Sequence, residues 1–415
     1  TALEEAQRYG SSREYLKRAH QIGGVQFYLP DATWRYVSLL TAFNEWGRSA
    51  ALLEAGLRQI WQSYHKLARV PIERRIRTQK LVPRRAVILG GNGVGDEILR
   101  LAFLRELAPK KSAQYGYICD QRVAGLFERA MPGTLTALHA SRTSGAFAVP
   151  EDQFWRDREG MPPWADRMRL TKRILREEIP KYGEIMLSED LMYSYFIQHG
   201  RYRGSVEPLF KALPERKSEA RAWLDSLPGA IKVGISWRSG QPGVARDICY
   251  TKISQWGDIL TLPNVSFVLL QYSNRREDIE REITEAKERF GVTIHVPNID
   301  LKNDFEGMVA LCKELDVVIA PGTTLRETAA AAGARTWTLS TTPYLPDQWR
   351  IDQADKETDL IFPSMIHFTA LRYNSREGAL AEIAKRLKEE VLTVSEAVAP
   401  PGPDQTSQIA QGARV

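Results

Sequence analysis

The sequence is poor in the residues that cross-link a chain or hold a structural metal. Its 415 residues include 3 cysteines and 6 histidines, and the cysteines, Cys119, Cys249 and Cys312, form no C-x-x-C pair. This scarcity excludes a disulfide scaffold, and we expect no metal site. The polar first ten residues do not resemble a secretory signal peptide, so we expect a cytoplasmic protein.

Long apolar runs are also absent. No segment approaches the ~18 consecutive apolar residues that a membrane-spanning helix requires, so we expect no integral membrane protein. With 43% hydrophobic and 26% charged residues, the composition is that of a folded globular chain, which excludes wholesale disorder. The length exceeds the ~250–300 residues that one core organises, so at least two domains are expected.

The net charge of +6 is concentrated near the beginning of the sequence. Residues 1–80 contain 13 Lys and Arg against 7 Asp and Glu, whereas the other residues contain 44 of each. An enzyme that acts on nucleic acid would show an excess of basic residues along the domains that bind it, so no nucleic-acid partner is expected. The excess centres on the cluster Arg69–Arg85, which is either a solvated helix face and linker or a peripheral contact with an anionic partner or the inner membrane.

Hydrophobic periodicity divides the chain into four regions. Residues 1–80 carry apolar side chains three or four apart and are predicted to be helical. In residues 81–225 and again in 226–393, short β-branched runs alternate with amphipathic stretches, which predicts two α/β domains with parallel sheets. Residues 394–415 have little to bury and are predicted to be a disordered tail.

Individual elements follow from these patterns. In the first α/β domain we predict strands at 86–91 and 115–120, and helices at 92–107 and 122–131. In the second we predict strands at 232–237, 265–272, 292–297, 316–321 and 336–341, and helices at 278–290, 304–315, 325–333 and 376–393. Residues 142–166 read as loop with short helices, and a linker is expected at 214–229, where prolines and a glycine interrupt the chain. Ligands of such sheets bind beyond the carboxyl ends of the strands, so the cleft between the domains is the expected site.

The first candidate motif is a glycine-rich turn from Gly90 to Glu97, between a predicted strand and a helix. Glycines close such a turn tightly and let a ligand approach the backbone N–H groups. The turn departs from a dinucleotide fingerprint because Asp96 stands at the third glycine position. Asp96 is either an N-cap of the helix or a general base at the rim of the cleft.

Two further motifs follow strands of the second domain. Trp237 and Arg238 stand where the first strand meets its loop, and an arginine fork suits a diphosphate, although arginines at strand ends are often surface residues. Thr323 and Thr324 open a predicted helix and offer hydroxyls beside free N–H groups, with Glu327 placed for a ribose diol. The alternative for this last turn is a capping box from Thr324 to Glu327.

In combination these motifs resemble a known family. The chain resembles bacterial GT-B glycosyltransferases in five stretches. These are G-x-G-x-G-D-E before an apolar helix, V-G-I-S-W-R-S-G, L-Q-Y, the stretch from 300 to 320 and the Thr-Thr turn. The resemblance lies near the heptosyltransferases and the O-linked N-acetylglucosamine transferases, including proteins with tetratricopeptide repeats ahead of the transferase. It covers roughly residues 85–372.

The resemblance implies a fold, a reaction and a set of site residues. The fold is GT-B, with two facing Rossmann-like domains, here after an N-terminal helical segment. The reaction is inverting transfer from a nucleotide-sugar donor to a hydroxyl of a glycan, a lipopolysaccharide or a protein, without a metal or other cofactor. Asp96 matches the proposed base, whereas the donor is expected to contact Gly95, Trp237, Arg238, Gln271, Thr323, Thr324 and Glu327. Many heptosyltransferases have His at the position of Glu327 and Asp at that of Gly322, which argues against ADP-heptose.

Two other functions compete with this interpretation. The departures at Gly322 and Glu327 allow a degenerate transferase fold that binds nucleotide or serves as a scaffold without turnover. The glycine turn also allows an NAD-dependent oxidoreductase. Two observations disfavour the oxidoreductase. Asp96 stands where the dinucleotide fingerprint has its third glycine, and Asp120 is the only acidic candidate for a ribose ligand.

Overall fold

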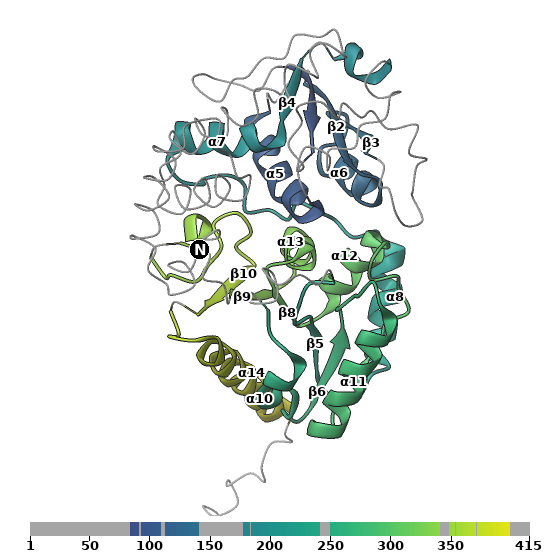
Figure 1. Cartoon of the computed structure of the whole chain (residues 1–415), viewed down its shortest axis with the longest axis vertical. Helices are drawn as coiled ribbons and strands as arrows, with labels where there is room; N and C mark the ends of the chain where they lie inside the picture. Colours follow the sequence, from purple (N-terminus) through teal and green to yellow (C-terminus); the bar gives the residue numbers. More distant parts are fainter. Residues whose placement is uncertain are drawn as a thin grey trace, which may run out of the picture.

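The computed structural model describes residues 84–90, 93–108, 113–140, 177–182, 184–240, 250–340, 348–352, 354–370 and 372–398. The predicted helical region 1–80, Cys249, the loop 142–166 and most of the Arg69–Arg85 cluster lie outside these residues. The described chain forms two α/β halves that face each other, with the first half at the top of Figure 1.

The first half is a parallel four-stranded sheet in the order β3-β2-β1-β4. Its strands are β1 (Arg85–Leu89), β2 (Gln114–Asp120), β3 (Leu135–Ala140) and β4 (Ile185–Leu187). Its helices are α5 (Val94–Leu107), α6 (Ala124–Ala130) and α7 (Ser188–His199), with the short helix η1 (Gln121–Val123) before α6. β3, β4 and α7 were not predicted from the sequence.

The second half is a parallel six-stranded sheet in the order β10-β9-β8-β5-β6-β7. Its strands are β5 (Ile231–Ile235), β6 (Val265–Leu269), β7 (Ile294–His295), β8 (Val317–Pro321), β9 (Thr336–Ser340) and β10 (Met365–Thr369). Counted along the chain from β5, this is the order 3-2-1-4-5-6 of a Rossmann sheet. The order reverses between β5 and β8, which is the point where such sheets bind ligands.

Helices cover both faces of the second sheet. On one face, α10 (Gly257–Leu260), α11 (Arg276–Phe290) and α14 (Arg376–Val398) bury their apolar side chains. On the other lie α8 (Pro214–Asp225), α12 (Phe305–Glu314) and α13 (Thr324–Ala331). Burial of these amphipathic faces supplies the main hydrophobic stabilisation of the half.

Two boundaries differ from the sequence prediction. Most of the predicted linker at 214–229 is the helix α8, which packs on α12 and so belongs to the second half rather than to the first. Pro214 occupies the first helical position, where a missing N–H costs nothing, so this proline starts a helix instead of interrupting the chain. At the other end, α14 continues to Val398, past the predicted start of the tail at residue 394.

The two halves share a packed interface. Helix α13 of the second half lies against α5 of the first, between the two sheets (Figure 1). The short helix η7 (Gln348–Arg350) adds Trp349, whose ring centroid lies 5.1 Å from that of Phe196 and 6.3 Å from that of Phe103. The core of the first half is therefore continuous with residues of the second, which fixes α5 relative to α13.

Candidate functional site

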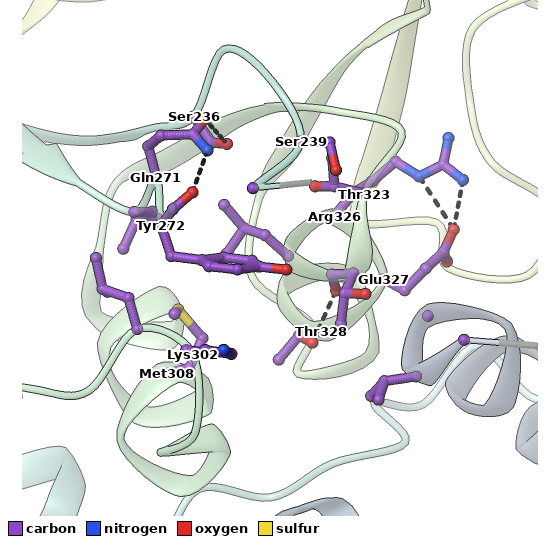
Figure 2. Close-up of a pocket in the computed structure, with 18 of the residues that line it drawn as sticks. Ser236, Ser239, Gln271, Tyr272, Lys302, Met308, Thr323, Arg326, Glu327 and Thr328 are labelled. Atoms are coloured by element: carbon purple, nitrogen blue, oxygen red, sulfur yellow. Dashed lines mark hydrogen bonds and ion pairs between the residues drawn. The ribbon is translucent and has the colours of Figure 1, made fainter. Parts of the chain in front are cut away.

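A pocket of about 470 Å³ lies where the carboxyl ends of β5, β6 and β8 face α5. Its volume is in the range that holds small-molecule ligands. The first half contributes residues 93–96 and Arg122, and the second contributes the loops after its strands together with the first turns of α12 and α13. Figure 2 shows this second-half wall, with Tyr272, Lys302 and Met308 at one end and Arg326 and Glu327 at the other.

The turn between β8 and α13 forms an anion cradle. Thr323 is the N-cap of α13, but its side chain makes no capping hydrogen bond. Its Oγ1 is buried and has no hydrogen-bond partner in the described part of the chain. A helix N-terminus offers unpaired N–H groups and a partial positive charge, so this turn suits a phosphate oxygen. The capping box from Thr324 is ruled out, because Thr324 lies inside the helix.

The carboxylate of Glu327 lines the pocket but is bound by two arginines. Its Oε1 accepts hydrogen bonds from Arg326 Nε at 3.0 Å and from Arg350 Nη1 at 2.9 Å. Its Oε2 accepts one from Arg350 Nη2 at 3.1 Å. The side chain is 4% exposed. Glu327 therefore lies where the sequence placed a ribose ligand, but with its oxygens already engaged by protein groups.

Arg350 is held in turn by a second buried carboxylate. Its Nε donates to Asp359 Oδ2 at 2.5 Å, and His367 Nε2 lies 2.8 Å from the same oxygen. All three side chains are fully buried. Burial alone would raise the pKa of Asp359, but the charge of Arg350 and the hydrogen bond with His367 hold that pKa below its usual value. Arg350 thus links the buried carboxylates of Glu327 and Asp359 in one chain of ionic hydrogen bonds.

Arg238 lines the pocket, yet its guanidinium pairs with a protein carboxylate. Nε and Nη2 each lie 2.8 Å from an oxygen of Glu282 on α11, and Nη1 donates to the carbonyl of Ser239. Both side chains of the pair are partly exposed, at 20% and 18%. A diphosphate would have to compete with the Glu282 carboxylate for the guanidinium of Arg238.

Gln271 has a positioning role at the end of β6. Its Oε1 accepts from Ser236 Oγ and from the backbone N–H groups of Trp237 and Arg238, at 2.9 to 3.1 Å. These bonds hold the loop after β5 against the end of β6. They also occupy the side-chain carbonyl oxygen of Gln271. The Trp237 side chain is fully buried in the core of the second half and does not line the pocket. The prediction of Trp237 as a donor contact is therefore not supported, because its ring packs in the hydrophobic core on one face of the second sheet.

The first half brings Gly95 and Asp96 to the pocket. Asp96 is exposed and lines the pocket from the first turn of α5. The N-cap of α5 is Gly93, so Asp96 is not the N-cap. Gly95 faces α13 so closely that an added Cβ would lie 3.3 Å from Thr324 Cα and 3.4 Å from Glu327 Cγ. This contact places the carboxylate-bearing turn of α5 opposite the anion cradle.

Glu97, the acidic residue next to Asp96, is buried and holds a structural hydrogen bond. It is 6% exposed, and its Oε2 accepts the backbone N–H of Asp120 at the end of β2. The added Cβ of a residue at Gly90 would fall 2.8 Å from Glu97 Oε1, so the glycine turn also makes room for this carboxylate. Glu97 ties α5 to its sheet, whereas its neighbour Asp96 lines the pocket.

Several pocket residues were not among the site residues predicted from the sequence, including four with long polar side chains. Arg326 follows the Thr-Thr turn, Lys302 precedes α12, Tyr272 follows Gln271, and Arg122 reaches the pocket from the first half. Arg122 pairs with Asp120 at 2.9 Å, donates to the carbonyl of Lys302, and lies 5.1 Å from the ring centroid of Phe305. Tyr272 lies within the L-Q-Y motif, Lys302 within the stretch from 300 to 320, and Arg326 two positions after the Thr-Thr turn, whereas Arg122 lies in none of these motifs.

The described residues contain neither a metal-binding cluster nor a membrane-spanning helix. No group of three or more His, Cys, Asp or Glu side chains there could hold a metal ion. No helix among the described residues is both long and apolar enough to cross a membrane. Cys119 and Cys312 are buried free thiols, and burial raises the pKa of the Cys312 thiol to about 12, which makes it unreactive near neutrality.

Comparison with known sequences gives one relative. No protein-family model matches the chain. Protein FlbA of Caulobacter vibrioides is 26% identical over 333 residues, which cover 75% of this chain and 47% of that protein. The chain thus spans about half the length of the curated relative that it matches.

Comparison with solved structures gives glycosyltransferases. The glycosyl transferase family 9 protein of Veillonella parvula covers 77% of this chain and 98% of its own, at 11% identity and a TM-score of 0.43. E. coli ADP-heptose LPS heptosyltransferase II covers 75% and 99%, at 12% identity and a TM-score of 0.44. Anabaena HepE in complex with UDP-glucose covers 75% and 97%, at 14% identity and a TM-score of 0.32.

Proposed function

We propose that this protein is a GT-B glycosyltransferase that moves a sugar from a nucleotide-sugar donor to a hydroxyl group. The observation that carries the proposal is the opposition of two elements across one pocket. The anion cradle at Thr323 lies at the switch point of a Rossmann sheet, and the exposed residue Asp96 lines the same pocket from the other half.

The cradle suits a nucleoside diphosphate leaving group. When the bond between the anomeric carbon and the phosphate oxygen breaks, its electron pair stays on the phosphate. Three groups can stabilise that charge: the N-terminus of α13, the hydroxyls of Thr323 and Thr324, and the guanidinium of Arg238. For Arg238 to do so, its ion pair with Glu282 must be replaced by a pair with the phosphate. These groups supply the charge stabilisation that a divalent cation supplies in other transferases, so we propose that the reaction needs no metal.

Asp96 is the proposed general base. The oxygen of the acceptor hydroxyl bonds to the anomeric carbon, and its proton passes to the Asp96 carboxylate. Attack from the α5 side, with departure toward α13, places nucleophile and leaving group on opposite faces of the sugar, which inverts the configuration. The acceptor is a glycan, a lipopolysaccharide or a protein that reaches the pocket along the first half.

A second candidate function is a nucleotide-binding scaffold without turnover. The observation that favours it is that two predicted donor ligands, Arg238 and Glu327, pair with other side chains of the protein. A scaffold of this kind would bind nucleotide but would neither transfer nor hydrolyse the donor.

One experiment tests both candidates. Thermal unfolding is followed with UDP, GDP, ADP, CMP and their sugar conjugates, because a ligand that binds only the folded state raises Tm by mass action. Each hit is then incubated with the protein, and release of free sugar is measured with and without EDTA. Slow donor hydrolysis that survives EDTA is the expected result. Binding without hydrolysis would support the scaffold, a requirement for Mg²⁺ or Mn²⁺ would contradict the metal-free mechanism, and no binding would contradict both functions.

A further inference from the structure

Apolar side chains gather at one end of the pocket. They come from the loop after β6 and from the start of α12, and they are Leu270, Tyr272, Leu301, Phe305 and Met308. Figure 2 shows Met308 and Lys302 at this end, away from Glu327. A nucleotide likewise has a planar, largely apolar base at one end and charged phosphates at the other. With the phosphates at the anion cradle, the base of a bound nucleotide falls at the apolar end.

The ring of Tyr272 is fixed from one side. A Cβ added at Gly240 would lie 2.5, 2.6 and 2.8 Å from three neighbouring ring atoms of Tyr272, Cε2, Cζ and Cδ2. A point so close to all three atoms lies over the face of the ring and not beyond its edge, so the Gly240 backbone covers that face. Gln271 Nε2 also donates to the Tyr272 carbonyl at 2.7 Å. Because Tyr272 lines the pocket, its other face is the one on which a planar base can stack.

Lys302 brings an ammonium group to the same end of the pocket. Its Nζ donates to Asn274 Oδ1 at 3.0 Å, and it forms no ion pair in the part of the chain that the structure describes. The carboxylate of Asp300 accepts instead from the backbone N–H groups of Lys302 and Asn303 and from the Asn303 side chain. An ammonium group has three N–H donors and no acceptor, so two donors of Lys302 remain for a ligand.

The backbone at Lys302 is held from the other half of the molecule. Arg122 Nη1 donates to the Lys302 carbonyl, and the Arg122 guanidinium lies 5.1 Å from the ring centroid of Phe305. The other guanidinium nitrogens of Arg122 bind the two carboxylate oxygens of Asp120, at 2.9 and 3.0 Å. Lys302 is therefore anchored before any ligand arrives, which lowers the entropy cost of binding.

We propose that Tyr272 and Lys302 hold the base of the donor nucleotide, and that Lys302 selects a base with a ring carbonyl. This inference rests on the proposed function and deepens it, because it names the class of donor. Uracil, cytosine and guanine each have a ring carbonyl oxygen that accepts a hydrogen bond from an ammonium group, whereas adenine presents ring nitrogens beside an amino donor. The donor is therefore a diphosphate sugar of uridine, cytidine or guanosine rather than of adenosine.

The test of selection compares UDP, CDP, GDP and ADP by calorimetry in the parent protein and in Lys302→Met. In the parent, the best of the three carbonyl-bearing nucleotides is expected to bind roughly 10- to 100-fold more tightly than ADP, the range of a charge-assisted hydrogen bond. Lys302→Met keeps the length of the side chain without its donors, so it should weaken the best nucleotide but not ADP. Lys385→Met, at an exposed lysine of α14 outside the pocket, should leave all four affinities unchanged.

Changes at Tyr272 test the stacking role. Tyr272→Leu is expected to weaken all four nucleotides roughly 5- to 150-fold, the range of base–aromatic stacking, while the affinity for inorganic pyrophosphate stays the same. Tyr272→Phe keeps the ring and should bind all four within about twofold of the parent. A loss in Tyr272→Phe as large as in Tyr272→Leu would show that the hydroxyl and not the ring binds the nucleotide, and would overturn the stacking role.

Other results would overturn the proposal while leaving the proposed function intact. They are tightest binding of ADP by the parent, an equal loss for ADP and the best nucleotide in Lys302→Met, and unchanged nucleotide affinity in Tyr272→Leu. A matching loss of pyrophosphate affinity in Tyr272→Leu would also overturn it, because the change would then act on the phosphates or on the fold. If the parent binds no nucleotide of the panel, the proposed function fails together with this inference.

Discussion

Glu327 and Arg350 form a bidentate ion pair directly behind the anion cradle. The two terminal nitrogens of Arg350 lie 2.9 Å and 3.1 Å from the two carboxylate oxygens, and both side chains are almost completely buried. Trp349, the preceding residue, packs among aromatic side chains of the first half. The same short helix therefore contacts the interface between the halves and the helix that carries the cradle.

Loss of Arg350 should be strongly destabilising. Arg350→Met removes the guanidinium that pairs with the buried carboxylates of both Glu327 and Asp359, and removal of one partner of a buried pair costs ~3–5 kcal/mol. The free energy of unfolding is measured by urea titration. Arg276→Gln, which breaks a pair on the exposed face of α11, is the control and should change it by less than ~0.5 kcal/mol. Equal effects of the two changes would contradict the importance of the buried pair.

Gly95→Ala should disturb the reaction more than nucleotide binding. The new Cβ would press on Thr324 and Glu327, so α5 must move away from α13 by a few tenths of an ångström. Overpacking of this kind costs ~1–3 kcal/mol, partly offset by the ~1 kcal/mol better helix propensity of alanine. We expect turnover to fall at least ~10-fold, because misplacement of a catalytic group weakens the transition state, with diphosphate affinity changed less than about threefold. Unchanged turnover would show that the helix contact does not position Asp96.

Asp96→Asn should abolish turnover while the fold is retained. Since Gly93 is the N-cap, the Asp96 charge contributes to stability only through the helix dipole, ~0.3–1 kcal/mol. A general base contributes ~10²–10⁴-fold to the rate. Asp278→Asn removes an acidic residue from the first turn of α11, outside the pocket, and should leave turnover intact. Donor hydrolysis by the Asp96→Asn protein at the parent rate would remove Asp96 from the mechanism.

The acid side of the stability profile should depend on Asp359. Its folded-state pKa is held below its usual value, so the unfolded chain binds the proton more readily. The stabilisation is complete above the usual carboxyl pKa of about 4 and is lost as the pH falls through the lower folded value. In Asp359→Asn the decline of Tm below about pH 4 should be shallower, although the variant is less stable at neutral pH. Parallel Tm profiles for the two proteins below that pH would contradict the shift.

The sequence by itself determined most of the secondary structure and the places where the site had to lie. Strands such as β1, β5 and β8 are short runs of β-branched and apolar residues, and helices such as α11 show a regular apolar stripe, so local periodicity was sufficient. Turns after parallel strands gather at the carboxyl edge of each sheet, and two facing domains bind ligands in the cleft between them, so the motifs at Asp96 and Thr323 could be assigned to one pocket from the sequence.

Only the tertiary structure decided which side chains are partners. β4 has three residues and forms by pairing with β1, a contact about a hundred positions away that leaves little local pattern. Arg238 meets Glu282 across 44 positions, and Glu327 meets Arg350 across 23, so neither pair is visible in a motif. Trp237 and Arg238 are neighbours in sequence, yet one ring is buried in the core and one guanidinium borders the pocket. The physical reason is that burial and charge pairing depend on which elements pack together, and packing is a property of the whole fold.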